Sequence, residues 1–413
     1  MAATDKATSA QSVSPAKRSR DRLLRNKPAV FGMVTIVLAI VVAILGYLIT
    51  PDATPNANDQ ILQITNKAPG FTTTLLKVRK NRSIEFRNVF NKMVYGQQHP
   101  YDLLPIGDYR FTDSSIIVDQ YTRKGGTLKT KEFGLADVAN PLSIEEGQGS
   151  ELKKGAIRFT TFNNEQKQIA VAKLQQQIEQ QHIENRTFYL GTDKFGRDIL
   201  SRLMIGVRIS LSVGLVAVVI SLVIGITIGA MAGYFRGFLD DVLMWLINVI
   251  WSIPALLLVF AITLALGKGF WQIFVAVGLT MWVEVARIIR GQFLSLREMQ
   301  FVEAAKSMGF SHLRTISRHI LPNVIGPLSV IAAANFATAI LVEAGLSFLG
   351  IGVQPPIPSW GGMLNENYGY IIGNNPFLAI IPGLAIMMMV LAFNLIGNGL
   401  RDAMDVRTST AGK

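Results

Sequence analysis

Two acidic residues in or next to long apolar segments, Glu284 and Glu343, are the side chains best suited to chemistry inside a membrane. A carboxylate at such depth can relay protons or ions, so an ion- or proton-coupled transporter acting alone through Glu284 is one hypothesis. The structural alternative is that Glu284 pairs with Arg287, three residues on, and that Glu343 reaches the outer membrane surface. We favour the structural alternative for both acids.

The sequence lacks the usual catalytic patterns. The stretch Gly345–Gly350 is not a nucleophile elbow, because its second glycine comes one residue too late. There is no GxxxxGK[ST] loop to hold a nucleotide. The four histidines are scattered, and the lack of cysteine excludes disulfides, thiolate metal sites and a cysteine nucleophile. We therefore expect no enzyme activity, no metal site and no cofactor bound by this chain.

The elements that position these residues are apolar segments long enough to cross a bilayer. Of the 413 residues, 50% are hydrophobic and only 16% are charged, which is below the charged share of soluble domains. A helix needs about 20 apolar residues to cross a bilayer. We predict six such spans, near residues 29–49, 211–232, 242–266, 270–289, 324–342 and 377–395.

The distribution of basic residues predicts the orientation of these spans. The net charge is +12, and the basic short segments are the N-terminal tail, the connection after the fourth span and the C-terminal tail. Six spans place all three on one side, which the positive-inside rule makes the cytoplasm. Four cations before the second span argue against this, but they end a long external loop, where the rule has little force: Lys194, Arg197, Arg202 and Arg208.

Small residues recur every four positions in the second span. They are Ser221, Gly225, Gly229 and Gly233, which share one helix face. Such a face lets two helix backbones approach closely in lipid. The functional interpretation is a mobile helix–helix contact, and static packing is the interpretation we favour. Pro254 and Pro382 lie inside the third and sixth spans and can kink them.

Residues 51–190 differ in kind from the spans, because they are polar and interrupted by Pro and Gly. Alternating patterns at Ser83–Arg87 and Ser115–Val118 predict short strands. Glu165–Arg186 reads as a glutamine-rich helix with Val171, Leu174 and Ile178 on one stripe. We expect a mixed α+β insertion, in which the lone histidines His99 and His182 do not bind metal.

The connection at residues 294–322 carries signals for two short helices. Ser295 and Glu298 have the spacing of a capping box, and Gly309 can end the first helix in a left-handed conformation. Ser311 can cap a second helix, which Pro322 then stops. Basic helix–turn–helix segments can read DNA. Here both ends are anchored close to the bilayer, so we do not favour nucleic-acid binding.

These residues resemble a known family. Glu303-Ala304-Ala305, followed by Gly309 and then Leu321-Pro322, is similar to the EAA loop of ABC importer permeases. The chain is more specifically similar to the second membrane subunit of dipeptide, oligopeptide and nickel permeases. Further matching stretches are Arg25–Pro28, Ser347–Gly352, Pro358–Gly361, Gly399–Asp402 and the external motif of Gly191, Thr192, Asp193, Gly196, Arg197 and Asp198. The departure is the insertion, since the family's loop after the first span is usually much shorter.

The resemblance implies an all-α membrane protein with the six-helix fold of ABC type I importer permeases and a mixed α+β extracytoplasmic insertion between helices 1 and 2. It also implies a bacterial inner-membrane location with both termini cytoplasmic. The expected organisation is a basic cytoplasmic tail (1–28), transmembrane helix 1 (29–50), the insertion (51–190), the permease domain (205–402, with the EAA loop at 294–322) and a C-terminal tail (403–413).

The resemblance further implies a permease subunit of an ATP-driven importer for di- or oligopeptides. The implied partners are a sister permease subunit, two cytosolic ATP-binding subunits and an external solute-binding protein, with ATP and Mg on the ATP-binding subunits. Glu303 would contact an ATPase and Gly309 would set the turn between two short helices. Nickel, glutathione and antimicrobial peptides remain alternative solutes, and the insertion is expected to dock the binding protein or cover the external mouth.

Overall fold

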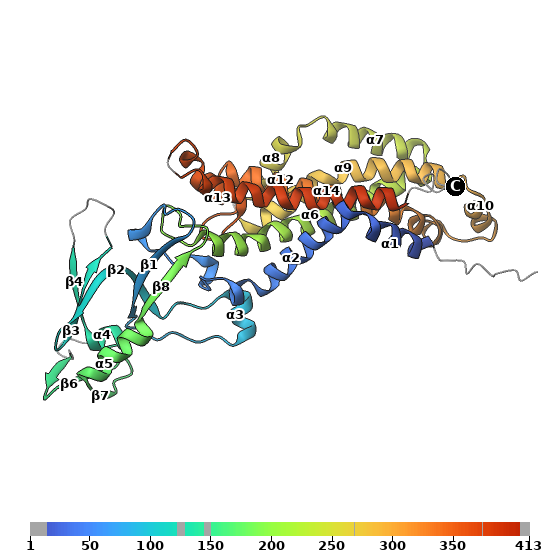
Figure 1. The fold of residues 1–413 in the computed structure, drawn as a ribbon. Coiled ribbons are helices and arrows are strands. Elements are labelled where there is room, and N and C mark those ends of the chain that lie inside the picture. Colours follow the sequence, from blue (N-terminus) through green and yellow to red (C-terminus); the bar gives the residue numbers. More distant parts are fainter. Residues whose placement is uncertain (1–14, 122–128, 144–149, 268, 374, 405–413) are drawn as a thin grey trace, which may run out of the picture. The chain divides into compact units, whose positions relative to one another are not determined.

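The computed structural model describes residues 15–121, 129–143, 150–267, 269–373 and 375–404 (Figure 1). The chain divides into two compact units, and each is considered by itself. The helical unit comprises residues 1–39, 210–352 and 384–413, and the mixed unit comprises 40–209 and 353–383. Residues 1–14 and 405–413, which make up much of the two predicted tails, lie outside the described residues.

Long apolar helices account for most of the helical unit and for part of the mixed unit. Five described helices are long and apolar enough to cross a membrane, and a bent pair makes a sixth if it counts as one span. The prediction of a helical membrane protein is therefore confirmed. The long helices are α2 (Lys27–Ile49), α6 (Ile199–Phe235), α9 (Phe270–Leu296), α12 (Leu321–Phe348) and α14 (Phe377–Met404), the bent pair is α7 (Gly237–Trp251) and α8 (Ala255–Leu266), and α1 (Pro15–Arg25) precedes α2.

The predicted third span, 242–266, is sharply bent at Pro254, where the sequence allowed a kink. Helix α7 ends at Trp251, α8 begins at Ala255, and the two helices meet at 90°. Pro254 stands immediately before α8 with φ −55° and ψ 124°, outside the helical region. Proline has no backbone N–H to continue the helix and crowds the preceding turn. Pro382, in contrast, lies inside α14, which continues through it.

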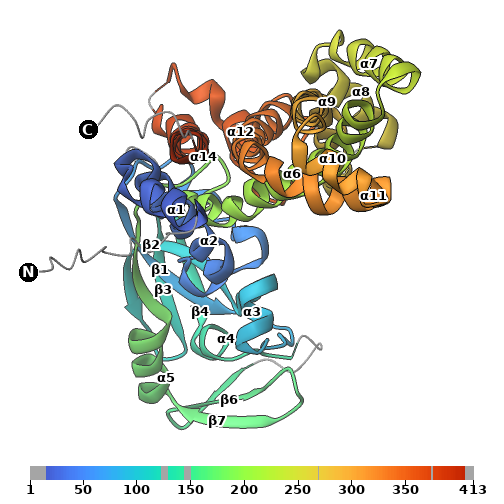
Figure 2. The same ribbon diagram turned by 90° about the vertical axis from the view of Figure 1, so that its right-hand side faces the viewer.

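Among the described residues of the mixed unit, the strands form two antiparallel sheets (Figures 1 and 2). The five-stranded sheet has the order β4-β3-β2-β1-β8, and the three-stranded sheet has the order β5-β6-β7. The predicted α+β insertion is therefore present. The strands are β1 (Phe71–Arg79), β2 (Tyr101–Phe111), β3 (Ser115–Gln120), β4 (Thr130–Gly134), β5 (Glu151–Lys153), β6 (Ala156–Thr160), β7 (Gln166–Ala170) and β8 (Ile183–Phe188).

One apolar core joins these sheets to short helices. Leu76 of β1, Ile116 of β3 and Phe159 of β6 are buried in it. The helix α4 (Leu135–Ala139) and the helix α5 (Val171–Gln177), which continues as a π-helical turn to His182, also contribute to this core. The remaining short elements are α3 (Val89–Tyr95), α13 (Trp360–Asn367) and the 3-10 turns Pro55–Ala57, Leu62–Ile64 and Tyr368–Tyr370.

Two expectations for the insertion are wrong. Ser83–Arg87 is not a strand, whereas Ser115–Val118 lies within β3 as predicted. Glu165–Arg186 is not one helix, because Gln166–Ala170 pairs with β6 and residues from Ile183 pair with β1. Only the middle of the segment is helical, where Leu174 and Ile178 are fully buried on the predicted stripe. Strand pairing at both ends has overridden the local helix preference.

Candidate functional site

A helical elbow lies between α9 and α12, within the stretch predicted as the EAA loop (294–322). Its first arm is α10 (Gln300–Ser307), and its second is α11 (His312–Thr315). Gly309 between them has φ +77°, a conformation that costs glycine little and other residues about 1 kcal/mol or more. The Ser311 side chain accepts a hydrogen bond from the Arg314 backbone N–H and so caps α11.

The elbow has a buried face and an exposed face. Val302 and Ala305 of α10 are buried, and Val302 packs with Phe293 of α9 and Val324 of α12. Glu303 and Ala304 are exposed on the other side of α10. The arrangement fixes α10 to both long helices while leaving a carboxylate free to meet another surface.

Exposed apolar side chains also line the elbow. Phe301 is 40% exposed, Met308 is 65% exposed and Leu313 is 76% exposed. A cluster of apolar side chains around exposed polar residues is typical of a protein–protein contact. Glu303 lies in the same short helix as Phe301. The elbow can therefore bind a partner through one carboxylate and several apolar contacts.

Tyr234, near the end of α6, contacts both arms of the elbow. Sequence patterns did not predict this residue. Its hydroxyl is 3.0 Å from Nδ1 of His312, and the two rings meet edge to face. The Lys306 ammonium lies 5.5 Å from the centre of the Tyr234 ring, and Arg297 donates to the Tyr234 carbonyl. The only sequence signal was an aromatic residue directly after the glycine stripe.

Two predicted helix signals around the elbow are wrong. The Ser295–Glu298 capping box does not form, because α9 runs on to Leu296 and Glu298 pairs with Arg236. Pro322 does not stop the second helix. A π-helical turn, Ile316–Ile320, precedes α12, and Pro322 falls in the first turn of α12, where its missing N–H removes no hydrogen bond. Leu321 begins the same helix.

The small-residue stripe of α6 lies against α9. A Cβ atom at Gly225 would come within 2.5 Å of Val285 Cβ, and one at Gly233 within 2.7 Å of the Arg290 carbonyl oxygen. A Cβ atom at Gly229 would overlap the carbonyl oxygen of Ala286. Ser221 is fully buried on the same helix. The two backbones therefore approach more closely than side chains would allow.

A bidentate ion pair ties α7 to α9 close to this packing. The Arg290 guanidinium donates to both carboxylate oxygens of Asp240, at 2.6 and 2.7 Å. Such a pair fixes geometry as well as charge. The sequence offered no fixed spacing that joins positions so far apart, so this contact was not predicted.

The two intramembrane acids occupy different environments. Glu343 is fully buried in α12 and accepts a hydrogen bond from Ser347 at 2.7 Å, so it does not reach a surface as expected. Glu284 is exposed on α9. The predicted Glu284–Arg287 pair does not form, since Arg287 donates to Asn248 and stacks 3.6 Å from the centre of the Trp251 ring.

The external motif forms a tight turn in the mixed unit. Oδ1 of Asp193 accepts from the Phe195 and Arg197 N–H groups, while Arg197 pairs with Asp193 and with Glu366 of α13, both at 2.6 Å. Asp198 accepts from the Ser201 N–H at 2.8 Å, just before α6. Burial raises the pKa of the Asp198 carboxyl.

Three further motif residues fix the preceding chain against this turn. The Thr192 hydroxyl accepts from the Lys67 N–H at 3.0 Å. Gly191 has φ +79° and Gly196 has φ +73°, and a Cβ atom at either would overlap a neighbouring carbonyl oxygen, that of Lys67 or of Ile61. The motif is therefore a structural junction between segments distant in sequence.

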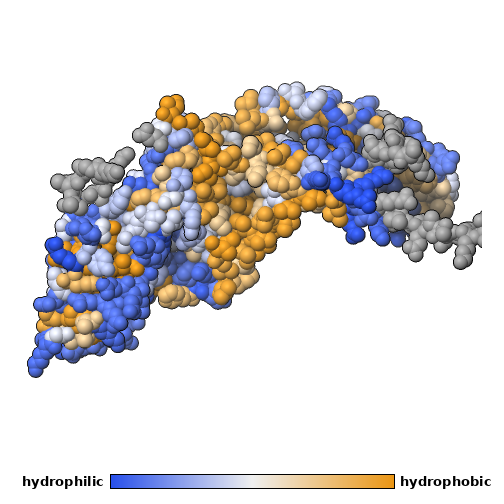
Figure 3. Space-filling view, in the orientation of Figure 1, coloured by the Kyte–Doolittle hydropathy of each residue, from blue (hydrophilic) through white to orange (hydrophobic). Residues whose placement is uncertain are grey.

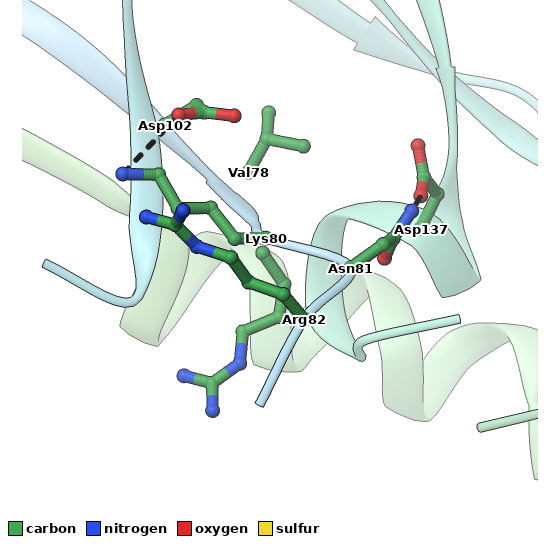
Figure 4. Close-up of a pocket in the computed structure, with 7 residues that line it drawn as sticks. Val78, Lys80, Asn81, Arg82, Asp102 and Asp137 are labelled. Atoms are coloured by element: carbon green, nitrogen blue, oxygen red, sulfur yellow. Dashed lines mark hydrogen bonds and ion pairs between the residues drawn. The ribbon is translucent and has the colours of Figure 1, made fainter. Parts of the chain in front are cut away.

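An open pocket of about 520 Å³ lies in the described part of the insertion (Figure 4). Lys80 lies 3.4 Å from Asp102, and Asn81 donates to Asp137 at 3.1 Å, so both carboxylates are already engaged. The guanidinium groups of Arg79 and Arg82 add positive charge. In the described part of the chain no group of three or more His, Asp or Glu residues could hold a metal ion. The pocket suits an anionic group but contains no catalytic arrangement.

Two family models match parts of this chain. Residues 225–410 match the family described as binding-protein-dependent transport system inner membrane component. Residues 14–69 match the N-terminal transmembrane domain of oligopeptide transport permease C.

The chain is also similar to individual proteins. It is 42% identical over 217 residues to the glutathione transport system permease protein GsiD of Escherichia coli O157:H7, covering 52% of this chain and 71% of the relative. The GsiD protein of Pectobacterium atrosepticum is also 42% identical over 217 residues, covering 52% of this chain and 72% of the relative. A solved inward-facing structure of the MetNI methionine ABC transporter gives a TM-score of 0.41 at 20% identity, covering 49% of this chain and 97% of that chain. A crystal structure of an amino acid ABC transporter with histidines gives 0.38 at 20% identity, covering 49% and 94%.

Proposed function

The chain belongs to the inner membrane components of binding-protein-dependent transport systems, the permeases of ABC importers, and from this premise we propose how it is powered and what it carries. The elbow is the binding site for a cytosolic ATP-binding subunit. The observation that carries this proposal is the division of α10 between buried Val302 and Ala305 and exposed Glu303. A short helix fixed to α9 and α12 can pass ATPase closure to both spans as a rigid-body motion.

We place the elbow and both termini on the cytoplasmic side of the bacterial inner membrane. Support comes from the excess of Lys and Arg in the tails and in the connection between α9 and α12. The insertion then lies outside, where it docks the solute-binding protein or covers the external mouth. The basic pocket at Arg79, Lys80 and Arg82 offers a cationic contact for an acidic group of that protein.

The complete transporter pairs this chain with a sister permease subunit, two ATP-binding subunits and a solute-binding protein. ATP and Mg belong to the ATP-binding subunits, so the carboxylates of this chain are not needed for hydrolysis. Glu343 is buried and hydrogen-bonded to Ser347, whereas Glu284 is exposed, so the two acids lie in different surroundings. Uptake by this chain reconstituted without an ATPase would support an ion-coupled transporter instead.

For the solute we propose short peptides, with glutathione as the first to test. The support is the 42% identity with GsiD proteins of glutathione transport systems and the match to oligopeptide permease C at the N-terminus. Uptake of radiolabelled glutathione and of a dipeptide into proteoliposomes holding the complete transporter distinguishes the two. Inhibition of this uptake by nickel ions would instead indicate that nickel is the transported solute.

Two variants of the elbow test the coupling role. Gly309→Pro forces φ to about −65°, against the observed +77°, and is expected to lower ATP-dependent uptake at least tenfold. Glu303→Ala removes the exposed carboxylate and is expected to weaken co-purification of the ATPase. Glu298→Ala is the matched control, since this exposed glutamate pairs with Arg236 before the elbow begins. Normal uptake by Gly309→Pro and Glu303→Ala in correctly inserted protein would refute the proposal.

A further inference from the structure

The helix α3 of the insertion presents an apolar face that the described chain leaves uncovered. None of its seven residues is buried. The exposed fractions are 72% for Phe86, just before the helix, 71% for Val89, 67% for Phe90 and 62% for Tyr95. Single exposed apolar residues are common, but a group this dense on ten residues of chain marks an interaction surface.

This exposure is fixed by hydrogen bonds around the helix. The Asn88 side chain caps α3 by accepting from the Asn91 N–H at 2.8 Å. The Arg87 N–H donates to Gln97 at 2.8 Å, and the Arg87 guanidinium donates to the Gly96 carbonyl at 2.9 Å. The segment is therefore a closed loop whose polar groups bond inward while its apolar side chains point outward.

Arg208 of α6 fixes the position of α3 relative to the end of α2. Its guanidinium donates to the last carbonyls of α3, at Met93 (2.6 Å) and Val94 (3.0 Å), where a cation is favourable. The same group donates to the carbonyls of Ala43 and Ile44 in α2. Ile44 is five residues before Ile49, the last residue of α2, and a helix rises about 1.5 Å per residue. Because Arg208 contacts both helices, α3 lies beside roughly the last 8 Å of α2.

Glycine makes this arrangement possible. Gly46 has non-helical angles (φ 1°, ψ −85°) and kinks α2 just after the two carbonyls that Arg208 binds. A Cβ atom at Gly46 would come within 2.8 Å of the Arg208 guanidinium. Carbonyls released by a kink near the bilayer need another donor, and Arg208 supplies it.

We propose that α3 is a membrane-surface helix, whose apolar side chains enter the interfacial layer of the bilayer that α2 spans. Continuity with α2 favours lipid, because Val41, Ile44 and Leu48 of that helix are also exposed. Figure 3 shows hydrophobic surface where Figure 1 places the end of α2 and α3. Tyr95 suits the interface, and Lys92 offers a cation to lipid phosphates.

The lack of cysteine in the chain makes a direct test simple. Phe90→Cys and, as a second position, Val89→Cys are labelled with a small fluorophore in the full-length chain, with its co-purifying subunits, in phospholipid nanodiscs. Leu152→Cys is the matched control, because Leu152 is an apolar residue of β5 that is 47% exposed. Quenching by brominated phosphatidylcholine reports lipid contact, and quenching by iodide reports water.

The proposal expects at least twofold stronger lipid quenching at positions 89 and 90 than at 152, and the reverse order for iodide. Iodide quenching at 89 and 90 equal to that at 152 would mean that α3 faces water. Weak quenching by both agents would mean that a protein subunit covers the helix. Either result overturns the proposal.

Discussion

Among single residues, Asp240 and Arg290 show how a contact can hold two helices without any local sequence signal. Both are charged residues within a largely apolar region, and their side chains are only 12% and 27% exposed. Charged side chains so placed need a partner. The sequence can therefore show that Arg290 needs a carboxylate, but only the fold selects Asp240 over its neighbour Asp241.

Replacing Asp240 by Asn should destabilise the protein by about 1–3 kcal/mol, because Arg290 loses a charged bidentate acceptor while staying half-buried. The measurement is the thermal unfolding temperature of purified protein in detergent. Asp241→Asn serves as the control, since Asp241 is exposed. Equal unfolding temperatures for the two variants would show that the ion pair does not stabilise the fold.

His182 predicts a pH dependence in the insertion. It is 2% exposed, and burial, with the nearby Lys77 and Arg79 charges, lowers its pKa below the ordinary 6.5. The unfolded state therefore takes up a proton first, so stability is full above pH of about 6.5 and falls as pH drops toward the folded pKa.

Hydrogen exchange of β1 amides at pH 7.5 and 5.5, corrected for intrinsic rates, should show reduced protection at the lower pH. Strand β1 is the appropriate probe, since the His182 ring bonds the Lys77 carbonyl at 2.7 Å. His182→Gln should remove most of this difference. A variant that keeps the full pH dependence would assign it to another group.

Among the elements, the close approach of α6 and α9 makes a size-dependent prediction. Gly229→Ala should destabilise by about 1–3 kcal/mol, because the added methyl group overlaps the Ala286 carbonyl. Gly291→Ala, in α9 with open space around it, should instead stabilise by about 0.5–1 kcal/mol through helix propensity. Unfolding in detergent measures both, and destabilisation by both would indicate a general intolerance of alanine.

The elements also show what sequence patterns can and cannot predict. Apolar length located the spans, and the spacing of Gly225, Gly229 and Gly233 predicted one face that does pack closely. The effect of a proline depends on backbone context, so the kink at Pro254 was predicted correctly and the stop at Pro322 was not. Pro322 sits in the first turn of α12, after a π-helical turn, where it is harmless, whereas Pro254 lies between two helices at 90°.

For the whole molecule, the insertion can be deleted between two residues that are adjacent in the sheet. Phe71 of β1 and Phe188 of β8 are direct partners in the sheet, so the chain enters and leaves it at adjacent positions. Residues 58–67 must be kept, since Asn58 bonds Arg197 and Lys67 bonds Thr192. A deletion should therefore leave intact the external motif and the residues that contact it.

Deleting residues 72–187 with a short glycine linker should therefore leave an inserted membrane protein. If the insertion docks the solute-binding protein, affinity for that protein falls and stimulated uptake falls with it. Binding is measured on the deleted and full-length transporters in nanodiscs. A shorter deletion, of 151–170, removes the three-stranded sheet together with Phe159 of the shared core, and tests whether that part of the insertion makes the contact. Unchanged affinity and uptake in the 72–187 deletion would leave the insertion only a spacer role.

At this scale the sequence motifs were sufficient for the family, because they are spread from Arg25 to Asp402 in a fixed order. They were insufficient for the insertion, whose strands pair across long distances. Arg208 joins α2 to α3, and Glu366 pairs with Arg197. No sequence pattern around either residue predicts these partners. Contacts of this kind depend on topology, which periodicity does not contain.

The strand order of the large sheet has a consequence for how the protein is made. Strand β1 is the first strand synthesised, yet one of its two edges pairs with β8, the last. That edge stays open while the rest of the insertion leaves the ribosome, and an open edge readily pairs with a foreign strand. The nascent chain is thus most vulnerable to aggregation during this interval, and slower synthesis lengthens it.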